Sequence, residues 1–141
     1  MKRVLYILTI LFITSLFAKD SLMQIKQLTP EAERVVIHEG TEWPFSDKNN
    51  DHEEDGIYKC KQCGSELFLS KSKFDSKSGW PSFDEAIDGA IEEIPDSDGL
   101  RTEIVCATCK AHLGHVFRGE GFTSKNTRHC VNSISLDFTK E

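Results

Sequence analysis

The chain has 141 residues, of which 17 are Lys or Arg and 23 are Asp or Glu, so its formal net charge at pH 7 is −6. This length allows one compact domain with a single core. Removal of residues 1–18 would take away Lys2 and Arg3 and no acidic residue, which would leave a net charge of −8. Because a nucleic-acid surface needs clustered cations that release counterions from phosphates, we expect no nucleic-acid partner.

The first 18 residues have the pattern of a secretory signal peptide. Two basic residues precede an apolar run of 14 residues from Val4 to Phe17, and Ala18 follows before the charged Lys19. An uncleaved membrane anchor is the alternative, although this run is shorter than the roughly 20 residues that span a bilayer. The sequence therefore predicts a signal peptide over residues 1–18 and an exported protein, periplasmic or otherwise extracytoplasmic, in a compartment where thiols tend to oxidise.

A helix is predicted directly after this segment. Thr29 is suited to cap it, Pro30 to occupy its first position, and Gly40 to end it. The polar stretch over residues 41–56 reads as a surface loop. Short β-like pieces follow, at 57–59, 66–69, 103–105, 115–117 and 131–138. This pattern predicts a mainly β, mostly antiparallel domain with a few short helices.

Four of the five cysteines form two Cys-x-x-Cys pairs, Cys60 with Cys63 and Cys106 with Cys109. Two such turns that face each other supply four thiolates at the tetrahedral geometry that Zn²⁺ prefers. Disulfides between the two turns are the alternative, which export makes more credible. A redox-active Cys-x-x-Cys is the least favoured interpretation, because two copies would have to share one small domain.

The fifth cysteine, Cys130, stands alone in the run RHCVN at residues 128–132. Alternating polar and apolar residues after it are typical of a strand, and the same parity places Arg128, Cys130 and Asn132 on one face. A guanidinium two residues away would lower the pKa of the thiol from about 8.5 toward neutrality and make it a nucleophile. The alternative is an inert cysteine packed in the core.

Two further clusters carry chemistry. His112 and His115, in the run HLGH, are suited to donate protons near a thiolate, and they could also be metal ligands. Trp80 stands on a Gly/Pro turn within SGWPSF at residues 78–83, where it could line a pocket or pack in the core.

Taken together, these motifs resemble the methionine-R-sulfoxide reductase (MsrB) family over a domain at residues 28–138. The motifs that carry the resemblance stand in order as LTPE at 28–31, GTE at 40–42, the first Cys-x-x-Cys pair, GWPSF at 79–83, the second pair, HLGHVF at 112–117 and RHCVN at 128–132. The resemblance implies one domain of two antiparallel β-sheets with short flanking helices, clamped by one structural zinc ion at the four paired cysteines.

The resemblance also implies a peptide-methionine (R)-S-oxide reductase that repairs proteins under oxidative stress. Cys130 would attack the sulfur of methionine sulfoxide, which yields methionine and a sulfenic acid. Of the other residues, His112, His115 and Asn132 would order water and protons at the oxygen, Trp80 would receive the terminal methyl group, and Arg128 would hold the thiolate.

One position departs from many members of that family. Ser78 stands where they carry a second, resolving cysteine. The sulfenic acid would therefore be reduced directly by an external thiol, either a thioredoxin-like protein or a small thiol. The expected partners are this reductant and oxidised methionine in peptides or proteins, and the expected state is a monomer.

Two other classes of function remain open from the sequence. One is a non-catalytic exported zinc-binding module for protein interaction, in which Cys130 only packs. The other is a disulfide-stapled binding domain that holds no metal, which would contain no zinc and at most one free thiol.

Overall fold

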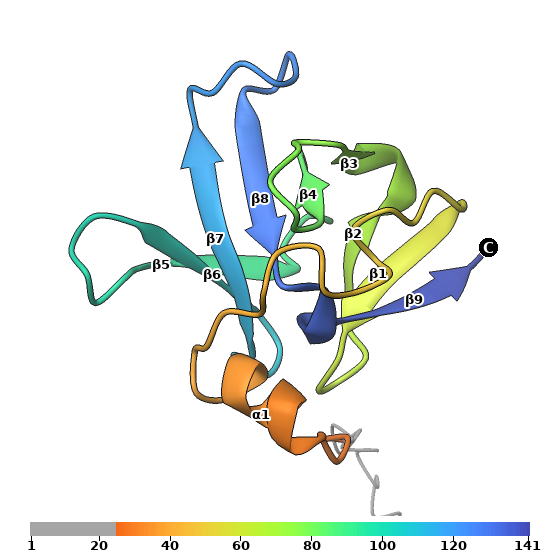
Figure 1. Ribbon diagram of the computed structural model, residues 1–141, viewed down its shortest axis with the longest axis vertical. Coiled ribbons are helices and arrows are strands. Elements are labelled where there is room, and N and C mark those ends of the chain that lie inside the picture. Colours follow the sequence, from red (N-terminus) through yellow and green to blue (C-terminus); the bar gives the residue numbers. More distant parts are fainter. Residues whose placement is uncertain (1–24) are drawn as a thin grey trace, which may run out of the picture.

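The computed structural model describes residues 25–141, and the signal peptide expected over residues 1–18 lies outside them. Residues 25–141 form one α-helix, nine short β-strands and two 3₁₀ turns (Figure 1). Within these residues, no helix combines the length and the hydropathy that a membrane crossing requires. Two antiparallel sheets dominate, so the predicted mainly β class is confirmed.

The helix α1 (Pro30–Val36) starts as the sequence predicts. The hydroxyl of Thr29 accepts a hydrogen bond from the backbone N–H of Ala32 at 3.3 Å. The prediction that Gly40 ends the helix was wrong, because the helix stops at Val36 and Glu39, with φ of 55°, makes the left-handed turn.

The smaller sheet has three strands in the order β2-β1-β9, all antiparallel. The strands are β1 (Gly56–Cys60), β2 (Glu66–Leu69) and β9 (Leu136–Lys140). The 3₁₀ turn η1 (Ser70–Ser72) follows β2 and leads the chain into the larger sheet.

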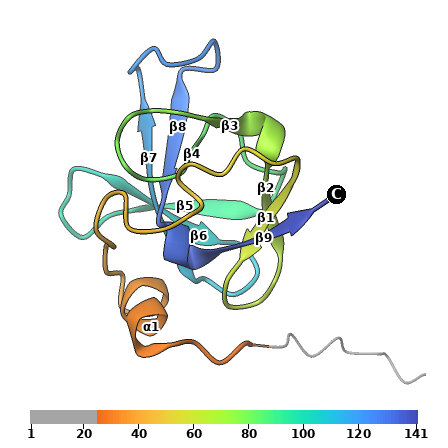
Figure 2. The same ribbon diagram turned by 45° about the vertical axis from the view of Figure 1, so that its right-hand side comes forward.

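The larger sheet has six strands in the order β3-β4-β8-β7-β6-β5, again antiparallel. The strands are β3 (Lys73–Phe74), β4 (Ser82–Phe83), β5 (Ile91–Pro95), β6 (Thr102–Cys106), β7 (His112–Arg118) and β8 (Thr127–Val131). Figures 1 and 2 show the β7–β8 hairpin and the β5–β6 hairpin projecting in different directions from the body of the domain.

The continuous strand predicted over residues 131–138 was wrong. The chain leaves the larger sheet at the end of β8, makes the 3₁₀ turn η2 (Ser133–Ser135) and enters the smaller sheet as β9. Ser133 and Ser135 are fully buried, although they are polar members of the alternating pattern. The buried carboxylate of Glu42 holds this turn, since it accepts hydrogen bonds from the backbone N–H groups of Ser133 and Ile134.

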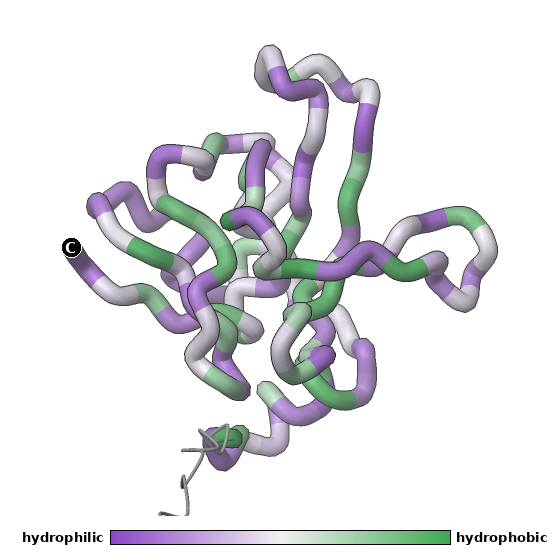
Figure 3. Tube along the Cα trace, turned by 180° about the vertical axis from the view of Figure 1, so that it is seen from behind, coloured by the Kyte–Doolittle hydropathy of each residue, from purple (hydrophilic) through white to green (hydrophobic). Residues whose placement is uncertain are grey.

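The core contains side chains from both sheets. Tyr58 and Phe68 from the smaller sheet meet Phe83 from the larger one, with Phe68 and Phe83 stacked at a centroid distance of 4.4 Å. Each such fully buried side chain contributes about 2 kcal/mol of hydrophobic free energy. Figure 3 shows apolar and polar residues alternating along the trace, as expected for strands with one face on this core.

Candidate active site and metal centre

Cys130 lies near the middle of the six-stranded sheet. It is paired with Ser82 on β4 at one side and with His115 on β7 at the other. Residues directly opposite one another on neighbouring antiparallel strands have their side chains on the same face of the sheet. The strand register therefore makes the thiol, a hydroxyl and an imidazole neighbours.

A small open pocket of about 130 Å³ lies over this part of the sheet. Its lining includes four of the residues singled out in the sequence, together with four others: Thr41, Trp80, Arg101, Gly114, His115, Phe117, Cys130 and Asn132. Larger hollows of about 460 and 470 Å³ lie beside the acidic loop and beside β9, but the thiol lines neither. The small pocket is therefore the one that contains the candidate reacting groups, Cys130 and His115.

Burial raises the pKa of the Cys130 thiol, whereas the positive charge of Arg128 and hydrogen bonds from Arg128 and Ser78 lower it. The net direction is upward, so the expectation that Arg128 brings this pKa toward neutrality was wrong for the free protein. One reason is that Glu120 engages the guanidinium through two hydrogen bonds of 2.7 and 2.9 Å. The negative charge of Glu120 itself also raises the pKa of the thiol.

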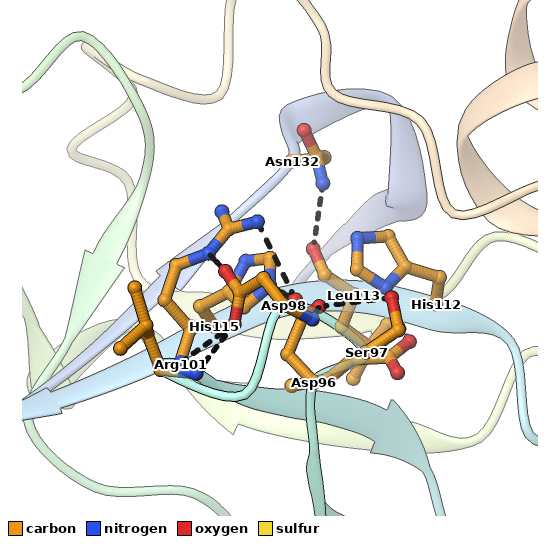
Figure 4. A network of polar contacts seen from close by, with 10 residues as sticks. Asp96, Ser97, Asp98, Arg101, His112, Leu113, His115 and Asn132 are labelled. Carbon is orange, nitrogen blue, oxygen red and sulfur yellow. Dashed lines mark hydrogen bonds and ion pairs between the residues drawn. The ribbon is translucent and has the colours of Figure 1, made fainter.

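The two histidines are each held by a carboxylate (Figure 4). His115 Nε2 lies 2.5 Å from Asp96 Oδ2, and His112 Nδ1 lies 2.6 Å from Glu103 Oε1. The two rings meet edge to face with their centroids 5.7 Å apart. His115 lines the pocket, whereas His112 lies behind it, nearly fully buried, and its Nε2 has no hydrogen-bond partner among residues 25–141.

The Asn132 amide is already used by the fold. Its Nδ2 donates to the carbonyl of Leu113 and its Oδ1 accepts from the backbone N–H of Glu42, both at 3.1 Å. The carbonyl of Glu42 in turn accepts a hydrogen bond from the Trp80 indole at 3.3 Å. Asn132 thus fixes β7 and the loop that positions Trp80, and it borders the pocket while doing so.

Sequence reasoning missed the supporting carboxylates Glu42, Asp96 and Glu103. Glu42 belongs to the quoted GTE motif, yet nothing local indicates that it is buried. Asp96 begins a DSDG turn and Glu103 stands on β6, where a carboxylate close to the histidines could have been suspected only from the pairing of β6 with β7.

Gly114 allows the two central strands to approach. A Cβ atom at this position would lie 2.0 Å from the carbonyl oxygen of Cys130, which no real contact permits. Its φ of 156° is also one that other residues rarely adopt. The glycine of the HLGH run therefore sets the distance between the histidine strand and the cysteine strand.

The four paired cysteines converge at the other end of the core. Their Sγ atoms all lie within 4.8 Å of one another, with 3.6 Å between Cys60 and Cys109 and 3.7 Å between Cys63 and Cys106. A tetrahedron of ligands at 2.3 Å from zinc has edges of about 3.8 Å, whereas a disulfide needs about 2.05 Å. All five cysteines are free in the structure, and the four paired ones are placed to bind a metal ion.

The two Cys-x-x-Cys turns have the same backbone geometry. Gly64 N–H donates to the carbonyl of Cys60 and Lys110 N–H donates to that of Cys106, each at 2.8 Å, and both donors have left-handed φ. Cys60 ends β1 in the smaller sheet and Cys106 ends β6 in the larger sheet. A shared ion would therefore connect the two sheets.

Fold and site thus define a mainly β protein with a half-buried thiol beside a carboxylate-held imidazole, and with four cysteines placed to bind a metal ion. The SelR domain family model matches residues 28–140. The chain is 54% identical to peptide methionine sulfoxide reductase B2, chloroplastic, from Arabidopsis thaliana over 81% of this chain and 57% of that protein. It is 52% identical to peptide methionine sulfoxide reductase B5 from Oryza sativa subsp. japonica over 79% of this chain and 83% of that protein.

The chain therefore belongs to the SelR domain family, that of the peptide methionine sulfoxide reductases B. The resemblance derived from the ordered motifs is confirmed. Among solved structures, a Mis18 "Yippee-like" domain aligns with a TM-score of 0.48 and 14% identity over 62% of this chain and 98% of that one, which is too weak a likeness to establish fold or function.

Proposed function

We propose that the protein reduces the R epimer of methionine sulfoxide in peptides and proteins to methionine, with Cys130 as the nucleophile. The observation that carries this proposal is the direct pairing of Cys130 with His115 under a pocket that Trp80 also lines. Membership of the reductase family favours this function over the non-catalytic interaction module.

The proposed reaction moves one oxygen atom. The sulfur of Cys130 attacks the sulfoxide sulfur and forms an S–S bond, while the protonated oxygen leaves as water. Water then attacks the Cys130 sulfur and breaks the S–S bond, and the products are methionine and a sulfenic acid on Cys130. The substrate sulfur gains the two electrons that the thiol loses. Because burial raises the pKa of the Cys130 thiol, its ionisation would accompany substrate binding, and its own proton can serve the oxygen through His115.

The remaining residues have supporting roles in this proposal. Asp96 orients the His115 ring, and Glu103 orients His112 behind it. The Trp80 ring offers an apolar wall for the methyl group of the sulfoxide. Because the methyl wall and the proton source are fixed relative to the thiol, only one arrangement of methyl and oxygen around the sulfur would be productive, which gives the choice of epimer.

The metal at the four paired cysteines is proposed to be a structural zinc ion, one per chain. Four thiolates are the ligand set that closed zinc sites use. His112 and His115 are proposed as proton-handling groups and not as ligands, since each is held by a carboxylate and the cluster that can hold an ion consists of cysteines alone among residues 25–141.

The proposed reductant is an external thiol. Hydroxyl groups lie on the β4 side of Cys130, where Ser76 is 2.7 Å from both Ser78 and Ser82. With four cysteines assigned to the metal, the chain has no further thiol to form an internal disulfide with Cys130. The sulfenic acid would therefore form a mixed disulfide with a thioredoxin-like protein or a small thiol, and a second thiol would release it. We propose that the enzyme is a monomer that binds no nucleic acid.

Export is proposed from the signal-peptide pattern of residues 1–18 alone. The mass of the protein recovered from cells would test it. A chain that begins near Lys19 in the extracytoplasmic fraction supports cleavage, and a full-length chain in the membrane fraction supports the uncleaved anchor.

The decisive test is turnover of separated R and S epimers of a peptide methionine sulfoxide, with dithiothreitol as the reductant. We expect reduction of the R epimer only, and its loss in Cys130→Ser with the zinc content unchanged. No turnover of either epimer by the zinc-loaded protein would overturn the proposal and favour the interaction module.

A further inference from the structure

Two aromatic side chains are exposed on the loop between α1 and β1. Trp43 is 82% exposed and Phe45 is 67% exposed, whereas Glu42 between them and the helix is buried. The buried Glu42 is tied to η2, Asn132 and Trp80 by four hydrogen bonds. The loop is thus anchored to the fold while it holds two large apolar rings in solvent.

This loop borders the catalytic pocket. Thr41 lines the pocket, and Phe45 N–H donates to the carbonyl of Gly79, next to Trp80, at 2.7 Å. The Phe45 ring lies directly over Gly79, since a Cβ there would be 2.7 Å from it. In Figure 1 the loop crosses in front of the end of β8. Single exposed apolar residues are common, but two aromatics on an anchored loop at a pocket edge form a surface suited to binding.

A third apolar side chain flanks the pocket from another segment. Leu100 is 91% exposed in the β5–β6 turn, and its neighbour Arg101 lines the pocket. Asp98 fixes this turn by accepting hydrogen bonds from the backbone N–H groups of Leu100 and Arg101 at 2.8 and 2.9 Å. Apolar groups from two fixed loops therefore stand beside the same small pocket.

We propose that Trp43 and Phe45, with Leu100 on the turn next to the pocket-lining Arg101, bind apolar side chains that flank the oxidised methionine in an extended substrate polypeptide. The inference rests on the proposed function and names its substrate class: hydrophobic segments that a folded protein would bury. The pocket of about 130 Å³ takes one side chain, so the rest of the polypeptide must lie across its rim, which Thr41 and Arg101 of the same two loops line. Burying aromatic surface against apolar neighbours supplies binding energy there.

The test compares two peptides that carry one methionine R-sulfoxide, flanked in one by leucine and valine and in the other by serine and glycine. We expect wild-type protein to show kcat/KM about tenfold higher for the apolar peptide, mainly through KM, because the rim binds ground state and transition state alike. Trp43→Ser and Phe45→Asn should each remove most of this preference. Asparagine suits the left-handed φ of 62° at position 45.

Ile37→Ser is the matched control, since it removes an exposed apolar side chain at the C-cap of α1, outside residues 41–45 and the β5–β6 turn. It should leave the peptide preference intact. Equal KM values for the two peptides in wild-type protein, or an unchanged preference in Trp43→Ser and Phe45→Asn, would overturn the proposal. A self-associated wild-type protein that becomes monomeric in Trp43→Ser would also overturn it, by assigning the surface to a second copy of the chain. Reduction of N-acetylmethionine R-sulfoxide by the wild type separates these results from failure of the proposed function itself.

Discussion

The ionisation of Cys130 depends on a balance between burial and one ion pair. Burial raises the pKa of the thiol, Arg128 opposes it, and Glu120 both adds a negative charge and holds the guanidinium. Arg128 also packs over the Phe117 ring at 4.5 Å, so its position is restrained from two sides. Glu120 therefore sets how much of the positive charge acts on the thiol.

Glu120→Gln should lower the pKa of Cys130, because it removes a charge that disfavours the thiolate. Alkylation of Cys130 by iodoacetamide, which consumes the thiolate, should rise with pH through an inflection above the ordinary range of a thiol pKa in wild-type protein. In the variant the inflection should lie at lower pH, with faster alkylation at pH 8. Glu93→Gln is the control, because Glu93 forms a comparable hydrogen bond to Arg118, which lies on the same β7–β8 hairpin as Arg128. An inflection that moves upward in Glu120→Gln would contradict this account.

The residues that react could be predicted from the sequence, but the residues that position them could not. Cys130, His115 and Trp80 stand in short motifs with recognisable chemistry. Their partners come from distant parts of the chain, since Asp96 is 19 residues from His115 and Glu42 is 91 residues from Ser133. Such pairs depend on strand register and loop path, which local patterns do not encode.

At the scale of elements, the close contact of β7 and β8 depends on one glycine. Gly114→Ala should lower the free energy of unfolding by about 2–4 kcal/mol, because the new methyl group would force the strands apart at Cys130. Urea unfolding and R-sulfoxide turnover would measure stability and activity together. Gly119→Ala is the control, since Gly119 has a left-handed φ of 86° and nothing within 4 Å of a new Cβ. Equal losses of unfolding free energy in both variants would mean that the strain of a positive φ, and not the contact with Cys130, causes the loss in Gly114→Ala.

The turn η2 redirects the chain from one sheet to the other, and Glu42 holds it. Glu42→Ala should cost about 2–4 kcal/mol of stability, because a buried N–H group of Ser133 and a half-buried one of Ile134 lose their acceptor. The loop of residues 41–45 should also become sensitive to proteases and the KM for substrate should rise. Limited proteolysis with urea unfolding would measure this, with the exposed Glu53→Ala as the control. A variant as stable and as protease-resistant as wild type would refute the anchoring role.

The tail shows why elements are harder to predict than fold class. Residues 131–138 alternate like a strand, yet Ser133 and Ser135 are buried in a turn. Alternation reports a local period of two but cannot show that the chain changes sheets. The motif order and the short strand pieces were enough for the mainly β class, because that class needs no knowledge of which strand pairs with which.

At the scale of the whole molecule, the two sheets share an aromatic core and converge again at the four cysteines. Cys60 ends a strand of the smaller sheet and Cys106 ends a strand of the larger one. A small domain gains much of its stability from such a link, because the free energy of metal binding becomes free energy of folding.

Removal of the metal should therefore destabilise the entire domain and not only one turn. Cys63→Ser should lose bound zinc and lower the midpoint of thermal unfolding by at least about 10 °C, since one fewer ligand weakens the link between the sheets. Circular dichroism on heating, with metal analysis of the same samples, measures both effects, and a chelator should reproduce them in wild-type protein. Cys130→Ser serves as the control, because it removes a thiol outside the cluster and should keep its zinc and its midpoint. A metal-free Cys63→Ser protein that unfolds at the wild-type temperature would mean that the aromatic core alone joins the sheets.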